Sequence, residues 1–317
     1  MKLHSLVLIL GLFHLSAVTA DMSVTISHGS SLRPFAVVGD TQRTLTVERV
    51  FLLREQNDEA RPLLIRSIVE DQPAFLVHLG DMTDWGSDDD AWKYFDTLVE
   101  PLKSAHIDIF PVMGNHEYFG LSKEHSLKNV EDRFPQIALS HWYLKKYGPI
   151  ALIFLDSNQK QLGETAWSNQ VTWFENILKQ LDSDPEVRGV LVFAHHPALS
   201  NSKVSGDEEC VRRYFLGPLL QSKKTLAYID GHAHGYEHFV QDGKHFIVSG
   251  GGGGPRVEYR TGKKALHADL FLGPVPRPFN YLIVQPLEDR IQITVKGFQK
   301  TDTHVGTIDQ IAIPFAP

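Results

Sequence analysis

The sequence has a single cysteine, Cys210, and it contains no Asn-x-Ser/Thr glycosylation site. One cysteine excludes an intramolecular disulfide, so the fold must depend on an ordinary hydrophobic core. For an exported chain, the two absences together favour a bacterial periplasm or medium over a eukaryotic secretory route. We interpret Cys210 as an inert structural residue, with a reactive thiol as the alternative.

Positive charge is also scarce. The 317 residues include 31 Lys and Arg against 38 Asp and Glu, which gives a formal net charge of −7. A nucleic-acid surface is therefore not expected, and an anionic substrate would need positive charge supplied locally. Internal repeats, low-complexity tracts and linkers are missing too, and a hydrophobic content of 42% is typical of one large globular domain.

Long apolar runs are missing except near the N-terminus, where residues 6–15 are mostly apolar. Lys2 precedes this run, and residues 18–20 (Val-Thr-Ala) form a cleavage site after it. The run is shorter than the roughly 20 residues that span a bilayer, so a membrane anchor is the weaker alternative. The sequence therefore predicts a signal peptide over residues 1–20, a single domain over residues 21–317 and a secreted or periplasmic location, with no membrane span after cleavage.

The chain does have five short polar blocks, each directly after an apolar run with strand character. The blocks are Gly-Asp-Thr-Gln at 39–42, Gly-Asp-Met-Thr-Asp at 80–84, Gly-Asn-His-Glu at 114–117, His-His-Pro at 195–197 and Gly-His-Ala-His at 231–234. We expect all of them at the carboxyl ends of sheet strands, which is where open α/β sheets place their sites.

Helical spacing of apolar residues separates these blocks. It predicts helices over residues 44–54, 59–70, 87–105 and 165–181. The alternation of strand and helix is typical of parallel sheets with crossover helices. After the fifth block, the apolar runs at 245–249, 281–284 and 291–295 have no helices between them, which predicts an antiparallel second layer. The predicted fold class is therefore α/β, with two sheets flanked by helices.

The residue types in these blocks indicate a metal centre for phosphate-ester chemistry. Hydrolysis needs a nucleophile at neutral pH and neutralisation of charge on the phosphoryl oxygens, and two metal ions about 3.5 to 4 Å apart supply both. Asp, Asn and His side chains suit such ions, and Gly39, Gly80, Gly114 and Gly231 would let the backbone turn sharply beside them. His195 alone would be typical of a buried core histidine, but the ordered set of five blocks favours a site.

This ordered set resembles the calcineurin-like metallophosphoesterase superfamily, whose motifs are GD-x-H/x, GD-x-x-D, GNH-D/E, H-x-P and GH-x-H. It is especially similar to purple acid phosphatases in the block at 114–117 and in the run Gly-His-Ala-His-Gly-Tyr-Glu at 231–237. The resemblance implies a four-layer α/β/β/α sandwich. It also implies an enzyme that hydrolyses phosphate monoesters on small substrates by attack of a metal-bridging hydroxide.

The resemblance further implies a ligand set for two divalent ions. One ion would be held by Asp40, Gln42, Asp81 and His234, and the other by Asp81, Asn115, His195 and His232. Asp81 would bridge the two ions. Mn²⁺, Fe²⁺ and Zn²⁺ are the candidate metals.

Roles around the metals are implied in the same way. His116 would donate to a phosphoryl oxygen or protonate the leaving group, and Asp84 and Glu117 would orient ligands through hydrogen bonds. Trp85, Tyr118 and Tyr236 adjoin ligand blocks and are candidates for substrate contact, with ordinary packing as the alternative for each. The glycine run at 250–254 lacks the Lys-Ser/Thr of a P-loop, which favours a close-packed turn near the metals.

Two positions depart from the family pattern. Gln42 stands where many relatives have histidine, and its amide oxygen would be a weaker ligand; a lost metal site is the alternative to a glutamine ligand. Asp84 stands where purple acid phosphatases have the tyrosine that colours their iron, so we expect a colourless protein. The alternative functions are a phosphodiesterase or nucleotide hydrolase and, from another class, a noncatalytic metal- or ligand-binding protein on the same fold.

Overall fold

Two six-stranded sheets pack face to face in the computed structural model, which describes residues 32–315. The predicted signal peptide lies outside this range. The first sheet has the order β12-β11-β10-β1-β2-β3, and the second has the order β4-β5-β6-β7-β9-β8. The strands of the first sheet are β1 (Phe35–Val38), β2 (Phe75–His78), β3 (Asp108–Pro111), β10 (Phe279–Pro286), β11 (Arg290–Phe298) and β12 (Gly306–Pro314). Those of the second are β4 (Tyr143–Tyr147), β5 (Ile150–Phe154), β6 (Gly189–Phe193), β7 (Thr225–Asp230), β8 (Tyr236–Gln241) and β9 (Lys244–Ser249).

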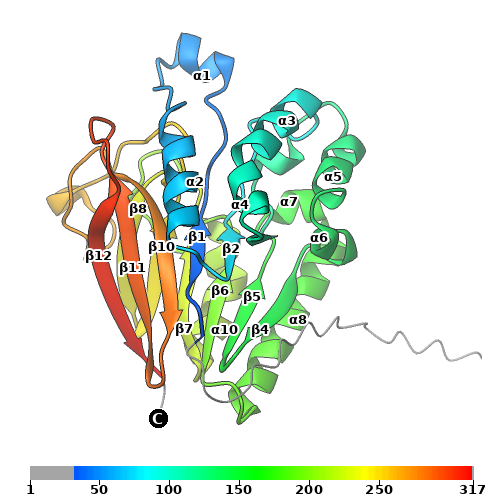
Figure 1. Ribbon diagram of the computed structural model, residues 1–317. Helices are drawn as coiled ribbons and strands as arrows, with labels where there is room; N and C mark the ends of the chain where they lie inside the picture. Colours follow the sequence, from blue (N-terminus) through cyan, green and yellow to red (C-terminus); the bar gives the residue numbers. More distant parts are fainter. Residues whose placement is uncertain (1–31, 316–317) are drawn as a thin grey trace, which may run out of the picture.

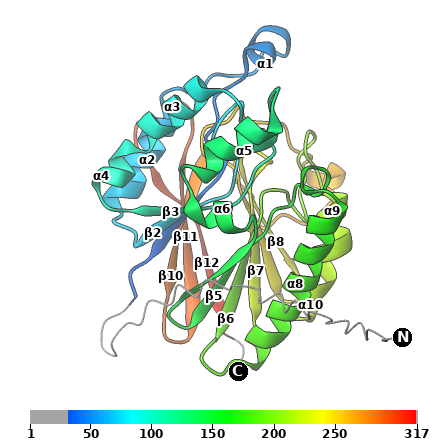
Figure 2. The same cartoon turned by 90° about the vertical axis from the view of Figure 1, so that its right-hand side faces the viewer.

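Helices cover the outer face of each sheet, so the molecule has four layers (Figure 1, Figure 2). The first sheet packs against α2 (Ala60–Glu70), α3 (Asp89–Leu98), α4 (Glu100–Ser104), α5 (Lys123–Glu131) and α6 (Pro135–Leu139). The second packs against α8 (Glu164–Ser183), which follows the short α7 (Gln159–Leu162), and against α9 (Glu209–Val211), a π-helical turn (Arg212–Leu216) and α10 (Gly217–Gln221). The predicted α/β/β/α sandwich is confirmed.

Apolar residues of β1 show how one strand supplies two cores. Phe35 and Val37 lie in the cluster between the sheets, whereas Ala36 and Val38 lie in the cluster under the helices. Such double burial explains why the strands before the polar blocks are continuous apolar runs and not alternating ones. Burying a charged side chain within these strands would cost free energy, so the polar residues lie where the strands end.

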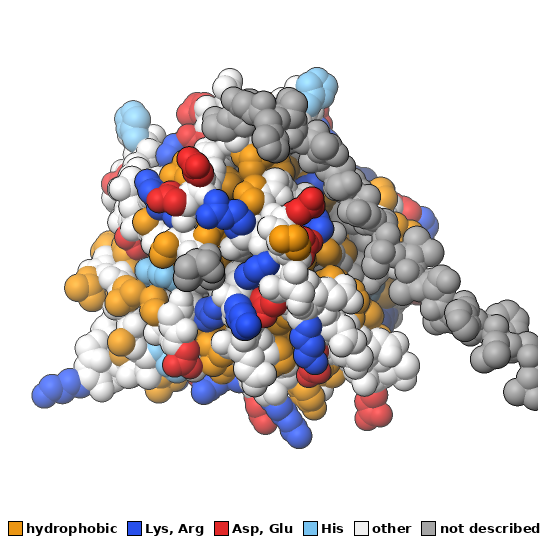
Figure 3. Space-filling view, turned by 90° about the horizontal axis from the view of Figure 1, so that it is seen from below, with side chains coloured by type: hydrophobic (Ala, Val, Ile, Leu, Met, Phe, Trp, Pro, Cys, Tyr) orange, Lys and Arg blue, Asp and Glu red, His pale blue; other side chains and the backbone are white. Residues whose placement is uncertain are grey.

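The carboxyl ends of the central strands meet at one end of the molecule. β1, β2 and β3 pair in parallel in the first sheet, and β5, β6, β7 and β9 pair in parallel in the second. All five polar blocks follow these strands, as predicted. At the opposite end, Lys and Arg side chains are interspersed with Asp and Glu where Figure 3 shows them.

Two expectations from the sequence are corrected. The helix expected over residues 44–54 is only the six-residue α1 (Thr46–Phe51), which buries no residue and projects from the body in Figure 1. The runs at 281–284 and 291–295 do pair antiparallel, as β10 with β11, but they extend the first sheet and form no separate layer. β10 pairs directly with β1 and is buried between the intersheet core and the helices, while β9 runs parallel to β7. Of the described residues, none belongs to a helix long and apolar enough to cross a membrane.

Candidate metal centre

Backbone hydrogen bonds tie the polar blocks to one another at the strand ends. The N–H of Asp40 donates to the Gly80 carbonyl at 3.0 Å, and the N–H of Gln42 donates to the Asp81 carbonyl at 3.1 Å. Within the second sheet, the N–H of Gly231 donates to the His195 carbonyl at 3.0 Å, and across the sheets the N–H of His232 donates to Asp40 Oδ2 at 2.9 Å. These hydrogen bonds therefore join four of the five blocks into one group of turns.

Three candidate ligands have a left-handed backbone, with φ of 63° at Asp40, 54° at Asp81 and 63° at His232. This conformation is uncommon outside glycine and clusters at functional sites. The glycines act differently from expectation. Of the four predicted, Gly80 alone has a positive φ, while a Cβ at Gly114 would lie 2.2 Å from Asp81 Oδ1. Glycine at Gly114 is therefore required for close approach to a ligand and not for a sharp turn.

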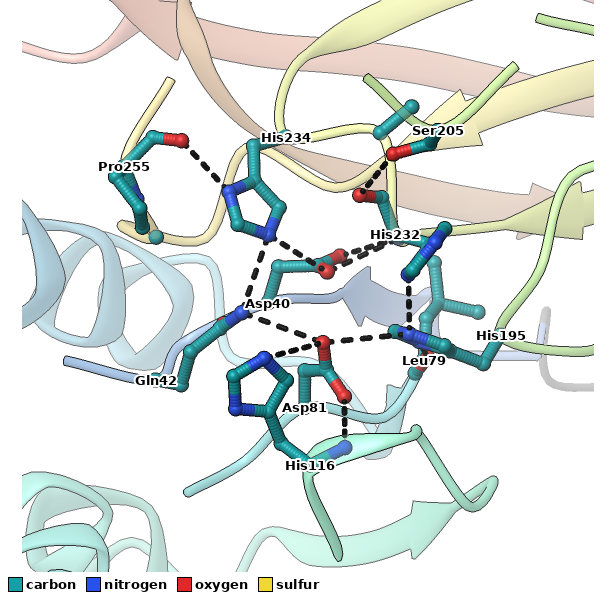
Figure 4. A network of polar contacts seen from close by, with 12 residues as sticks. Asp40, Gln42, Leu79, Asp81, His116, His195, Ser205, His232, His234 and Pro255 are labelled. Carbon is teal, nitrogen blue, oxygen red and sulfur yellow. Dashed lines mark hydrogen bonds and ion pairs between the residues drawn. The ribbon is translucent and has the colours of Figure 1, made fainter. Parts of the chain in front are cut away.

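Four of the predicted ligands form one half of the site (Figure 4). Gln42 Nε2 lies 3.3 Å from Asp81 Oδ2 and 3.1 Å from His234 Nε2, and His234 Nε2 lies 3.4 Å from Asp40 Oδ1. All four side chains are buried or nearly so. One atom each of Asp40, Asp81 and His234 lies within 4.8 Å of the other two, a spacing that a metal ion could occupy.

The remaining predicted ligands form the other half. His195 Nε2 lies 3.0 Å from Asn115 Oδ1, 3.0 Å from His232 Nδ1 and 3.3 Å from Asp81 Oδ2. Asp81 Oδ2 is therefore within 3.3 Å of a ligand atom in each half. All seven predicted ligands are brought together, with Asp81 between the two groups.

Hydrogen bonds on the far side of two histidines aim their lone pairs into the site. His195 Nδ1 lies 2.8 Å from the Leu79 carbonyl, and His234 Nδ1 lies 2.7 Å from the Pro255 carbonyl. A carbonyl only accepts, so each Nδ1 carries a proton, and in the singly protonated ring each Nε2 presents its lone pair inward. Metal-binding histidines are held in this way.

Gln42 also fits a metal site. Its Oε1 is buried and has no hydrogen-bond partner among the described residues, while its Nε2 faces Asp81 and His234. Turning the amide by 180° places the oxygen beside those two ligands, and the two orientations differ only in which atom is named oxygen. Carboxylate, amide and imidazole donors together suit first-row divalent metals. The donor set therefore fits divalent metal ions.

The pKa values of the buried carboxylates and histidines also favour a bound cation. Although burial opposes it, the charges of His195 and His116 hold the pKa of Asp81 well below its usual range. Burial likewise opposes protonation of His195, but the Asp81 carboxylate raises the pKa of that ring to about 10. Burial, followed by the charges of His196 and His195, holds the pKa of His232 far below its usual range. A buried anion thus shares a proton with one histidine, and a cation would release that proton on binding.

Glu117 positions the Asp81 turn from behind. Its Oε2 accepts hydrogen bonds from the N–H groups of Asp81 and Gly114, both at 2.8 Å. Its Oε1 accepts from Met82 at 2.8 Å and from Thr83 at 3.3 Å. Burial and then the nearby Asp81 charge raise the pKa of Glu117 to about 7. Its expected orienting role therefore acts on the backbone of a ligand turn.

His116 enters the site beside Asp81. Its N–H donates to Asp81 Oδ1 at 2.9 Å, and its Nε2 lies 3.8 Å from Asp81 Oδ2. Its Nδ1 donates to the Asp84 backbone carbonyl at 2.9 Å. The Asp84 carboxylate differs from expectation, because it pairs with Arg43 at 2.9 Å and not with a ligand. Asp84 therefore orients His116 through its main chain.

Two of the expected substrate contacts are contradicted. The Tyr118 hydroxyl donates to Asp156 Oδ2 at 2.5 Å, and its ring is buried under the helices of the first sheet. Tyr236 is fully buried between the sheets, where its hydroxyl donates to Asp309 Oδ2 at 2.8 Å. Trp85 remains a candidate, since it is 38% exposed and its ring centroid lies 5.8 Å from that of Phe119. Phe119 itself lies 4.5 Å from the His116 ring, centroid to centroid.

The glycine run at 250–254 packs against the first block. Its Gly252 and Gly254 N–H groups donate to the carbonyls of Gly39 at 2.9 Å and Asp40 at 2.8 Å. A Cβ at Gly252 would lie 2.1 Å from the Gly39 carbonyl oxygen. The predicted close-packed turn is confirmed, and it supports a ligand turn.

A sixth polar block was missed by the sequence interpretation. Asp156, Ser157 and Asn158 follow β5, and Asn158 Nδ2 donates to the carbonyls of Met113 at 3.0 Å and Gly114 at 3.4 Å. The rule used for the other five blocks, a polar run directly after a buried strand, also applies here. These residues therefore support the Gly-Asn-His-Glu block from the second sheet.

Comparisons with known proteins agree with this geometry. Purple acid phosphatase 7 of Arabidopsis thaliana is 26% identical over 166 residues, which cover 45% of this chain and 48% of that protein. Among solved structures, purple acid phosphatase PPD1 from yellow lupin (Lupinus luteus) superposes with a TM-score of 0.66 at 16% identity, covering 90% of this chain and 54% of that one. GAP50, the anchor in the inner membrane complex of Plasmodium, gives 0.61 at 17% identity, covering 90% of each chain. The chain thus spans about half the length of both phosphatases. The family model for the calcineurin-like phosphoesterase matches residues 33–236, most of the chain, and the protein belongs to that family.

Proposed function

We propose that the protein is an exported, divalent-metal-dependent phosphoesterase that hydrolyses phosphate monoesters of small molecules. One observation carries the proposal. Asp81 Oδ2 lies 3.3 Å from an atom of Gln42 in one half of the site and 3.3 Å from an atom of His195 in the other. A single buried carboxylate between two groups of donors is the arrangement that a pair of metal ions requires.

The chain's residues have distinct tasks in this proposal. Asp40, Gln42, Asp81 and His234 would hold one ion, and Asp81, Asn115, His195 and His232 would hold the other. Divalent ions held there supply Lewis-acid activation of water and neutralise charge on the phosphoryl group. His116 faces the same space through Nε2, which is a donor to a phosphoryl oxygen or the leaving group when both ring nitrogens carry a proton. The Asp84 carbonyl keeps the proton of this ring on Nδ1 when the ring is neutral.

The proposal extends to the whole chain. Residues 21–317 form the mature single domain after removal of residues 1–20, and the exported protein acts in the periplasm or the medium. Monoesters are the first choice of substrate. The same ligands would serve a phosphodiesterase or nucleotide hydrolase, and the fold shared with GAP50 keeps a noncatalytic binding protein as the rival from another class.

A paired assay separates these possibilities. The mature protein is stripped with a chelator, supplied with Mn²⁺, and tested on an aryl phosphate monoester and the matching diester. We expect turnover of the monoester that is lost in Asp81→Ala and His232→Ala and kept in Asp90→Ala, which changes an exposed aspartate of α3. Faster turnover of the diester would assign the protein to the phosphodiesterases. No turnover with metal bound would refute an esterase and favour the binding protein.

A further inference from the structure

His196, the second histidine of the block at 195–197, has no role in the site described so far. Its side chain is only 8% exposed, and its ring centroid lies 4.5 Å from that of His232 and 4.8 Å from that of His195. One of its ring nitrogens lies within 4.8 Å of a nitrogen of each of those two histidines. The ring therefore lies directly beside two of the candidate metal ligands.

Ser157 determines which nitrogen of His196 carries a proton. Ser157 Oγ accepts a hydrogen bond from the backbone N–H of His196 at 3.0 Å and lies 2.7 Å from His196 Nδ1. Within residues 32–315, that Nδ1 is the one acceptor in reach of the hydroxyl hydrogen. The hydroxyl therefore donates to Nδ1, and an imidazole that accepts at Nδ1 carries its own proton on Nε2.

The resulting tautomer is opposite to that of the neighbouring ligands. His195 and His234 donate from Nδ1 to backbone carbonyls and present a lone pair at Nε2. His196 presents an N–H at Nε2, and this atom has no hydrogen-bond partner among the described residues. A protonated nitrogen cannot bind a metal, but it is a good donor to an anionic oxygen.

We propose that His196 donates its Nε2–H to a phosphoryl oxygen of the substrate and is not a metal ligand. Ser157 is then a positioning residue, which acts through the His196 ring. Its side chain is buried, so a substrate does not reach its oxygen and we do not assign it as a nucleophile. The Tyr228 hydroxyl donates to the His196 carbonyl at 2.9 Å and holds the backbone of the same residue. The inference rests on the proposed function for the identity of the anion.

The first test measures which ring nitrogen of His196 carries a proton, and it does not require enzymatic turnover. The ring nitrogens of the histidines are observed by NMR in ¹⁵N-histidine-labelled, zinc-loaded protein, and the His196 signals are assigned by their loss in His196→Gln. We expect a protonated Nε2 and an unprotonated Nδ1, with this preference lost in Ser157→Ala and kept in Ser157→Thr. A protonated Nδ1 in the wild type would overturn the inference.

The second test reads phosphate binding and metal content together. Inorganic phosphate is titrated by calorimetry into the zinc-loaded protein, and bound zinc is counted by elemental analysis. We expect His196→Phe to weaken phosphate binding about 10- to 100-fold, the range for one hydrogen bond to a charged acceptor, with unchanged zinc content. His196→Gln, which keeps an N–H donor, should recover part of the affinity. His125→Phe changes an exposed histidine of α5 and should affect neither phosphate binding nor zinc content.

The outcomes distinguish this inference from the proposed function. Equal phosphate binding by the wild type and His196→Phe would overturn the donor role alone. Loss of zinc from His196→Phe would make His196 a ligand and also overturn it. If the zinc-loaded wild type binds no phosphate, the proposed function fails and the donor role fails with it.

Discussion

Replacing Glu117 with glutamine should damage both the stability and the metal affinity of the protein. Each carboxylate oxygen of Glu117 accepts two backbone hydrogen bonds from the turns that carry Asp81 and Asn115. In Glu117→Gln, one oxygen becomes an NH₂ group, so two buried N–H groups lose their acceptor and face a donor. Hydrogen bonds to a charged acceptor are worth about 1.5 to 3 kcal/mol each, so the loss is roughly 3 to 6 kcal/mol.

The assay is urea unfolding of chelator-treated protein at pH 8, above the pKa of about 7 that burial and Asp81 give Glu117, so that the carboxylate is charged. Titration of Mn²⁺ into the same protein should show an affinity about 10- to 100-fold lower, as for other groups that orient metal ligands. Glu124→Gln, at an exposed position in the first turn of α5, is the matched control. A change of less than about 0.5 kcal/mol together with unchanged affinity would refute the reasoning.

Three further predictions follow from the same geometry. Gly114→Ala places a Cβ 2.2 Å from Asp81 Oδ1 and should cost about 1 to 3 kcal/mol in urea unfolding, whereas Gly306→Ala, at an exposed position where a Cβ would meet open space, should change stability by less than about 0.5 kcal/mol. Burial raises the pKa of Glu237 to about 7 from 4.5, so the folded state keeps a proton that the unfolded state loses. Stability should therefore fall by roughly 3 kcal/mol between pH 4.5 and pH 7 relative to Glu237→Gln, in urea series at matched pH. Iron-loaded protein should show no visible tyrosinate band, because Asp84 lacks a phenol and the Tyr118 and Tyr236 hydroxyls bind Asp156 and Asp309.

Each of these has an outcome that contradicts it. Full stability in Gly114→Ala would mean that the ligand turn has room for a methyl group. A pH dependence identical in the wild type and Glu237→Gln would show that Glu237 titrates alike in both states. A strong visible band in the pure iron-loaded protein would require a tyrosine ligand that the described structure does not contain.

The sequence predicted the ligand blocks well because two local properties coincide there. A strand buried on both faces must be apolar, and the first polar residues after it must lie at its end, as Asp40 and Asp81 do. The same rule would have found Ser157 after β5. The C-terminal strands were wrongly expected in a second layer because β10 pairs with β1, a partner more than 240 residues away in the chain, and local spacing carries no information on such pairing.

The directions of side chains and the backbone conformation could not be predicted from the spacing of residues in the sequence. Tyr118 adjoins a ligand block, yet the 3₁₀ turn at His116–Tyr118 directs its hydroxyl to Asp156. Asp84 was expected to orient a ligand through its carboxylate. The carboxylate forms an ion pair with Arg43, and the backbone carbonyl of Asp84 accepts the hydrogen bond from His116. The left-handed backbone at His232 results from the packing of the whole site and has no counterpart in composition.

The central claim is that Asp81 lies between two metal ions, and the most direct measurement is anomalous X-ray diffraction from crystals of the chelator-stripped protein soaked in Mn²⁺. The account predicts two anomalous peaks. One would contact Asp40, Asp81 and His234, and the other would contact Asp81, His195 and His232. A single peak away from Asp81, or no peak in these two groups of residues with Mn²⁺ bound elsewhere, would contradict the account.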